Sequence, residues 1–192
     1  MTEEIIQNLP ELLQAHICTL RKASLDDSNK INMCQSSIKV VHFDKIPIEY
    51  SRGKTWKYMP KSNDALYIGL DGFWYFIEFK NGGVDKSDVY RKLYDSLIML
   101  VELEIIPDFD FARKFLKYIL VYNSEKYPNI QKSDSRDETF SYLLRLAQSE
   151  VKLFDLKNFE GYLINEVHTY SKELFHEKFI VRMERQENRT AV

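Results

Sequence analysis

Cysteine, net charge and long apolar runs are all scarce in this chain, and each shortage excludes a class of protein. Cys18 and Cys34 are its two cysteines, and no histidine lies at metal-ligand spacing beside them, which excludes a zinc finger and a disulfide framework. The 27 basic and 29 acidic residues nearly cancel, so no positive field over the whole molecule attracts nucleic acid. Any site for a polyanion must therefore be a local patch.

The chain also lacks any apolar run near the roughly 20 residues that a membrane span needs. Its first residues, MTEEIIQNLPELLQ, begin acidic and carry no basic segment typical of a signal peptide. We therefore expect no membrane partner and a soluble, reducing, cytoplasmic setting. The length of 192 residues and the 44% hydrophobic content predict a single domain over 1–192.

Hydrophobic periodicity predicts a mixed α/β fold in which helices cover a central sheet. A helix over about 10–22 precedes a strand at 38–46, a basic exposed loop at 47–63, and two strands around an Asp-Gly turn. A strong helix from Asp85 to about Glu104 and a strand buried on both faces at 114–123 follow. The C-terminal elements are expected to be a helix at 138–148, strands at 151–156 and 161–170, a helix at 171–179, and a flexible tail at 183–192.

The segment DALYIGLDGFWYFIEFKNG places three charges at one end of an apolar hairpin. With a two-residue turn, Asp64 would lie opposite Phe79, and Glu78 would point to the other face. With a three-residue turn, a left-handed Gly72 completes a bulged turn, and Asp64 lies opposite Glu78. In the second register Lys80 joins the two carboxylates on one face, and this is the register that we predict.

Two carboxylates on residues whose β-carbons lie about 5 Å apart repel each other unless a cation lies between them, and either a divalent metal or an ammonium meets that need. Oxygen ligands from Asp64 and Glu78, completed by water, a substrate phosphate and the Phe79 carbonyl, suit Mg²⁺ or Mn²⁺ rather than zinc. Such a metal lowers the pKa of a bound water. Lys80 beside it would orient or deprotonate that water, or neutralise the transition state.

An Asp at the start of one strand and Glu-x-Lys near the end of its antiparallel partner, with a helix before and a helix and strand after, resemble the PD-(D/E)XK nuclease superfamily. Asp64 and Glu78-Phe79-Lys80 carry the resemblance, which covers about residues 9–123. It implies a restriction-endonuclease-like core of helix, three strands, helix and strand, with an appended part at about 124–182. It also implies that Asp64 and Glu78 hold the metal, that Lys80 assists the water, and that DNA, less often RNA, is cut. Asn63 stands where the proline in the family's name would be.

Two further groups of residues are candidates for this site. In many relatives an acid of the first helix joins the site, which here would be Glu11, although the helix dipole is the simpler explanation for an acid in a first turn. The basic loop mixes aromatic side chains with Arg52, Lys54, Lys57 and Lys61, a combination that grips phosphates and stacks on bases. Solvated surface charge with anchoring aromatics explains the same loop about as well.

The helix that follows the hairpin carries two charged pairs at four-residue spacing. Asp88 with Lys92 and Arg91 with Asp95 are therefore expected to pair within the helix.

Together these residues predict a Mg²⁺- or Mn²⁺-dependent nuclease. The alternative is a nuclease-like domain without activity that recognises another protein, as an interaction or immunity-type module, which the near-neutral charge and the 14% aromatic content favour. A purely structural hairpin end would leave the repulsion between the acids unexplained. Because a small nuclease domain without a separate recognition domain often needs a dimer or a partner, a homodimer or a protein partner is also open.

Overall fold

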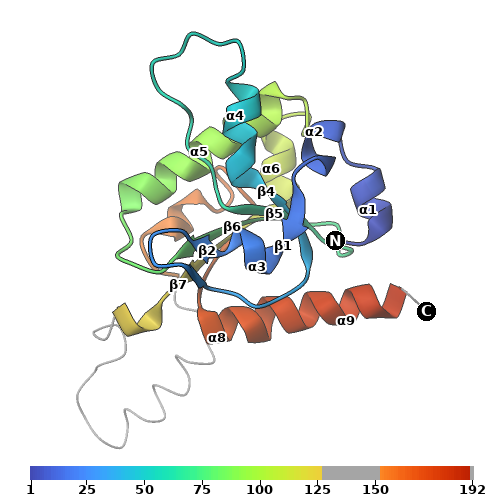
Figure 1. Ribbon diagram of the computed structural model, residues 1–192, viewed down its shortest axis with the longest axis vertical. Helices are drawn as coiled ribbons and strands as arrows, with labels where there is room; N and C mark the ends of the chain where they lie inside the picture. The colour runs from blue at the N-terminus through green and yellow to red at the C-terminus, as the bar shows by residue number, and fades with distance from the viewer. Residues whose placement is uncertain (127–151, 191–192) are drawn as a thin grey trace, which may run out of the picture.

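A six-stranded mixed sheet runs through the molecule (Figure 1). The computed structural model describes residues 1–126 and 152–190. The pairing is antiparallel between neighbours as far as β6, whereas β7 is parallel to β6 and β8 is parallel to β7. The predicted mixed α/β class is confirmed. In spatial order the strands are β1 (Ile17–Thr19), β4 (Lys39–His42), β5 (Ala65–Ile68), β6 (Trp74–Lys80), β7 (Leu116–Tyr122) and β8 (Glu166–Ser171).

The parallel pairing of β6 with β7 requires a crossover connection, which α5 (Lys86–Glu102) and α6 (Phe109–Phe115) provide. α5 begins where the sequence predicts, because the Asp85 side chain accepts a hydrogen bond from the Ser87 backbone N–H and caps the first turn. Leu93, Leu97 and Leu100 are buried at the predicted helical spacing. α6 is not among the predicted elements.

Side chains of β6 alternate between the two faces of the sheet, and each face has its own cover. Glu78 points toward α5, where it contacts Lys92. Phe79 points to the other face, where its ring contacts that of Phe175. This second cover is a C-terminal helical segment made of α8 (Lys172–Phe175), the π-helical turn η5 (His176–Ile180) and α9 (Val181–Thr190). Glu78 is therefore enclosed between the sheet and α5.

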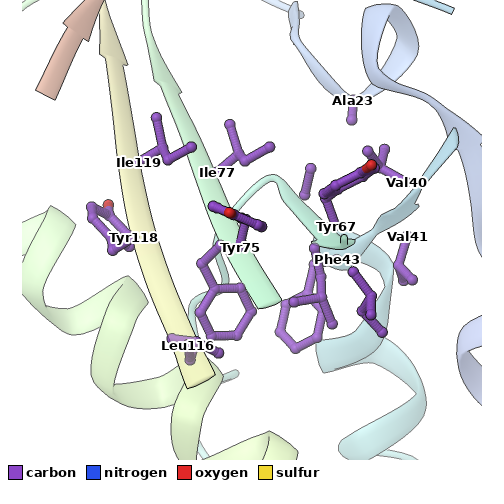
Figure 2. Close-up of a cluster of buried hydrophobic side chains, with 14 of the residues drawn as sticks. Ala23, Val40, Val41, Phe43, Tyr67, Tyr75, Ile77, Leu116, Tyr118 and Ile119 are labelled. Carbon is purple, nitrogen blue, oxygen red and sulfur yellow. The ribbon is translucent and has the colours of Figure 1, made fainter. Parts of the chain in front are cut away.

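Buried apolar side chains from distant parts of the sequence form a continuous hydrophobic cluster. Figure 2 shows a part of it, to which Val40 of β4, Tyr67 of β5, Ile77 of β6 and Ile119 of β7 contribute. Met183 of α9 belongs to the same cluster, so the C-terminal helix shares one core with the sheet.

The N-terminal part departs most from the prediction. Instead of one helix over 10–22, the chain forms α2 (Glu11–Gln14), the edge strand β1 and α3 (Leu20–Ala23). Ile17 and Cys18 pair with Val41 and Val40 of β4, and this contact between distant segments outweighs the local helical periodicity. Other short elements here are α1 (Glu3–Gln7) and a small hairpin of β2 (Leu25–Asp26) with β3 (Ile31–Asn32).

The predicted strand at 38–46 and the basic loop predicted at 47–63 also have different boundaries in the structure. β4 ends at His42, and the chain turns through η1 (Phe43–Lys45) into α4 (Ile46–Tyr50), where Pro47 fits the first turn. The remainder, residues 51–61, is a largely exposed loop that projects from the body above α4 (Figure 1). The basic loop thus begins only at residue 51.

The C-terminal part confirms one strand and extends one helix. The predicted helix at 138–148 lies outside the described residues, which resume after the short helix η2 (Ser124–Lys126) at residue 152. The predicted strand at 151–156 is wrong for 152–156, where the chain leads into the 3-10 helix η4 (Leu156–Phe159). The strand predicted at 161–170 begins at Glu166 as β8. The final helix extends to Thr190, through most of the segment expected as a flexible tail.

Candidate functional site

The β5–β6 hairpin has the three-residue turn. Ala65 pairs with Ile77, the Gly69 N–H donates to the Phe73 carbonyl, and Gly72 has a φ of +79°. Continuing this register by one residue places Asp64 opposite Glu78. The predicted register is therefore confirmed, and the two carboxylates share the face of the sheet that α5 covers.

The two carboxylates differ in how completely they are hydrogen-bonded. Asp64 Oδ2 accepts a bond from the Phe79 backbone N–H at 2.6 Å, and its Oδ1 lies 3.2 Å from Lys92 Nζ. The Glu78 side chain is fully buried, and its Oε1 lies 2.7 Å from Lys92 Nζ and 3.1 Å from Lys80 Nζ. Glu78 Oε2 is buried and has no hydrogen-bond partner. An unpaired buried carboxylate oxygen is costly, and a donor or a cation bound to it would remove that cost.

Lys92 is the residue of this site that sequence reasoning missed. It projects from α5 between Asp64 and Glu78, so it does not pair with Asp88 inside the helix as predicted. Asp88 instead binds Lys80 Nζ at 2.8 Å and Lys61 Nζ from the end of the basic loop. The signal in the sequence was the adjacent Leu93: a lysine next to a buried helix position can reach the sheet beneath.

The charges in this cluster shift one another's pKa values. Burial, followed by the charge of Glu78, raises the pKa of Asp64 well above its ordinary value. Burial also raises the pKa of Glu78, although Lys92 and Lys80 oppose it. Burial disfavours both ammonium groups, but the neighbouring carboxylates outweigh it and raise the pKa of Lys80 and that of Lys92. Lys80 is therefore a cation and a hydrogen-bond donor at neutral pH, which argues against deprotonation of water by this side chain.

A cleft of about 220 Å³ opens beside the cluster, with Asp64, Phe79 and Lys80 in its lining. The β2–β3 hairpin supplies the opposite wall, where Asp26 accepts a bond from Asn81 Nδ2 at 2.9 Å. Hydrogen bonds from Asn29 and Asn81 lower the pKa of Asp26 to about 2. The remaining lining residues are Ser24, Leu25 and Met33. A small polar ligand can therefore approach Asp64 and Lys80 from this side.

Each cation of the basic loop has a contact inside the protein. The Lys54 ammonium lies 4.9 Å from the centre of the Trp56 ring, and that of Lys57 lies 5.4 Å from the centre of the Tyr58 ring. Both rings are exposed, with 46% of Trp56 and 68% of Tyr58 accessible. The other two cations form ion pairs, Arg52 with Glu49 and Lys61 with Asp88. Lys61 thus joins the loop to the carboxylate cluster, and a nucleic-acid contact for the loop stays a prediction.

The donor set for a metal is small. Within residues 1–126 and 152–190, no three acidic, histidine or cysteine side chains are grouped as metal ligands, so Glu11 does not complete a set with Asp64 and Glu78. Glu11 is exposed in the first turn of α2, beside the edge strand β1, where the helix-dipole explanation applies. Two carboxylates and a backbone carbonyl fit a Mg²⁺ or Mn²⁺ ion that takes its other ligands from water or substrate. The unpaired Glu78 Oε2 supports that fit.

No family model, no curated protein and no solved structure matches this chain. Among the helices that the structure describes, none has the length and apolar character needed to cross a membrane.

Proposed function

We propose that this protein is a metal-dependent nuclease that hydrolyses phosphodiester bonds, in DNA rather than RNA. The observation that carries the proposal is the arrangement of Asp64, Glu78 and Lys80 on one face, beside a cleft, with Glu78 Oε2 buried and unpaired. Two buried carboxylates and a lysine at a strand end are costly to fold, which favours a functional reason for them.

The strand topology supports the same proposal. β4, β5 and β6 form an antiparallel series, α5 follows, and β7 lies parallel to β6. This is the order of strands and helix that the resemblance to the PD-(D/E)XK nucleases implies. The helix before the strands is replaced by α2, β1 and α3, so the agreement begins at β4.

Each residue then has a separate task. Asp64, Glu78 and the Phe79 carbonyl would hold Mg²⁺ or Mn²⁺, which would stabilise negative charge on a phosphoryl oxygen. Lys80 carries its proton and donates a hydrogen bond to the attacking water or to the phosphate, so it orients the water and neutralises charge. The exposed Trp56 and Tyr58, with the cations beside them, suit contact with bases and backbone phosphates.

A second candidate function is a nuclease-like module without activity that binds another protein. The observation that favours it is the Lys92 ammonium, which already lies between the two acids and balances one of their two charges. The exposed aromatic side chains of the basic loop suit a protein interface equally well.

Cleavage assays on the full chain separate the two functions. Single- and double-stranded DNA and RNA are incubated with Mg²⁺, Mn²⁺ or a chelator, and the parent is compared with Glu78→Gln and Lys80→Met. The nuclease proposal expects DNA cleavage that the chelator abolishes, no cleavage by Glu78→Gln, and a loss of about 100-fold or more for Lys80→Met. The control is Lys86→Met at the start of α5, where the lysine is exposed and pairs with Asp155, and it should cleave like the parent.

An inactive parent that is nevertheless stabilised by Mn²⁺ would support the module without activity. An inactive parent that is indifferent to Mn²⁺ would mean that the carboxylate cluster is an ordinary ion-pair network.

A further inference from the structure

The Lys92 ammonium takes the position that a cation would take between two carboxylates. Its Nζ lies 2.7 Å from Glu78 Oε1 and 3.2 Å from Asp64 Oδ1, and it is the one described group that contacts both side chains. A Mg²⁺ ion shared by the same two residues would lie about 2.1 Å from a carboxylate oxygen of each. A metal and this ammonium would then be held side by side against the same two carboxylate groups, where their like charges repel strongly.

The net charge of the cluster also indicates that Lys92 and a divalent metal do not bind there together. A chain of ion pairs runs from Lys61 through Asp88, Lys80 and Glu78 to Lys92 and Asp64. These are three ammonium groups and three carboxylates, so the chain is neutral as it stands. Asp44 adds one negative charge that acts on Asp64 and Lys92 from a greater distance. A divalent cation would leave this cluster with an excess of positive charge unless an ammonium moved away.

The Lys92 side chain can move out of the site. It is 18% exposed, whereas that of Glu78 is fully buried, so part of the Lys92 side chain already reaches solvent. The ammonium ends a flexible four-carbon stem on a helix whose backbone is held by its own hydrogen bonds. Rotation about the side-chain bonds can therefore carry the charge out of the site while α5 stays in place.

We propose that Lys92 and the metal occupy this site in turn: the ammonium holds the two carboxylates together in the metal-free protein, and a divalent cation displaces it. This inference rests on the proposed metal-binding function and adds to it a residue that sets the metal affinity. Lys92 is thus a positioning residue for the metal-free site and a competitor for the cation.

Mn²⁺ titration tests the exchange without any measurement of activity. The full chain, freed of metal, is titrated calorimetrically as the parent, as Lys92→Met and as the control Lys86→Met. A unit charge at this distance changes the affinity for a proton by one to three powers of ten, so we expect Lys92→Met to bind Mn²⁺ about tenfold or more tightly than the parent. Lys86 is exposed on the same helix and pairs with Asp155, so its replacement should leave the affinity unchanged.

The outcomes distinguish this inference from the function on which it rests. Equal or weaker Mn²⁺ binding by a folded Lys92→Met, with clear binding by the parent, would overturn the exchange and leave the metal site standing. Absence of Mn²⁺ binding in the parent and in Lys92→Met alike would overturn both proposals. A variant that merely damaged the fold would bind the metal less well, so tighter binding is a result that structural damage does not produce.

A crystal of the parent soaked in Mn²⁺ keeps the inference testable if Lys92→Met does not fold. Manganese bound to Asp64 and Glu78, with Lys92 Nζ more than about 4 Å from both, would support the exchange, because an ion pair ends near that distance. Manganese at the site with both lysine contacts intact would overturn it, and so would a soaked crystal without manganese there.

Discussion

Replacing Lys92 with methionine should strongly destabilise the metal-free protein at neutral pH. The change keeps most of the side-chain volume but leaves Asp64 and Glu78 facing each other without the ammonium that bridges them. Removing one partner of a buried ion pair typically costs about 3–5 kcal/mol in the free energy of unfolding. For a chain of this size each kcal/mol shifts the melting temperature by about 2–4 °C, so we expect a decrease of about 6–20 °C.

The geometry explains why this destabilisation is large and what limits it. At an effective dielectric constant of about 20, the distances of 2.7 Å and 3.2 Å correspond to direct attractions of about 6 and about 5 kcal/mol, before the cost of burial is subtracted. The destabilisation is limited because either acid can take up a proton. Burial already raises the pKa of Asp64 and that of Glu78, and removal of Lys92 raises both further.

This protonation gives the destabilisation a definite pH dependence. An acid whose pKa is raised by folding contributes stability below its unfolded pKa, and that stability is lost as the pH rises through its folded pKa. Lys92→Met should therefore be closer to the parent at pH 5 than at pH 8. Thermal unfolding followed by circular dichroism, with a chelator present, measures both differences.

Two further variants test the cause of the destabilisation. Lys86→Met should melt close to the parent, because that lysine is exposed. Glu78→Gln in the Lys92→Met background should recover a large part of the stability, because it removes one of the two unbridged charges. If Lys92→Met were as stable as Lys86→Met, or equally impaired at pH 5 and pH 8, the electrostatic reasoning would be wrong.

Three other predictions concern single features of the structure. Glu78→Gln in the parent should hold or raise the melting temperature at pH 8. It should also remove the loss of stability that begins as the pH rises above about 4.5, the ordinary pKa of this group. A melting temperature that falls at pH 8 would contradict the raised pKa. Tyr118→Phe removes a buried hydroxyl that has no partner, so denaturant unfolding should show equal stability or a gain of about 1 kcal/mol, whereas a clear decrease would reveal a hidden hydrogen bond. Replacing Lys54, Lys57 and Lys61 together with glutamine should weaken DNA binding and lower the slope of its salt dependence by about 0.9 for each phosphate that is no longer neutralised, and unchanged binding would assign the loop another role.

The parts of the fold that the sequence predicts are those in which several local signals agree. In α5, the cap at Asp85 and the apolar spacing of Leu93 and Leu97 both indicate the same helix. In the hairpin, Gly72 and the alternation of the flanking strands indicate one register. The segment 10–22 carries a helical spacing of apolar residues, but Ile17–Thr19 forms a strand because β4 lies beside it. Sequence periodicity contains no information about that distant partner.

The same distinction between local signals and distant contacts applies to the residues of the site. Asp64, Glu78 and Lys80 could be placed together by counting residues through a turn, because the register of a hairpin is a local property. Lys92 comes from a helix outside the hairpin, and its approach to the acids depends on how α5 packs on the sheet. The repulsion between the acids predicted that a cation was required but not which one would supply the charge.

The two charged pairs of α5 show when the local rule fails. Arg91 is exposed, and it forms the predicted pair with Asp95 at 3.4 Å, although the same carboxylate oxygen also accepts a hydrogen bond from the Lys61 backbone N–H at 2.8 Å. Such a pair at four-residue spacing contributes only about 0.3–0.5 kcal/mol. Lys92 lies one position further round the helix, beside two buried carboxylates whose attraction for an ammonium is several kcal/mol before desolvation. The stronger attraction decides the rotamer of Lys92, and Asp88 is left to pair with Lys80 and Lys61. A charged pair on a helix can therefore be predicted from spacing where both residues face solvent, whereas a pair that borders the buried face must be judged against the charges of the sheet.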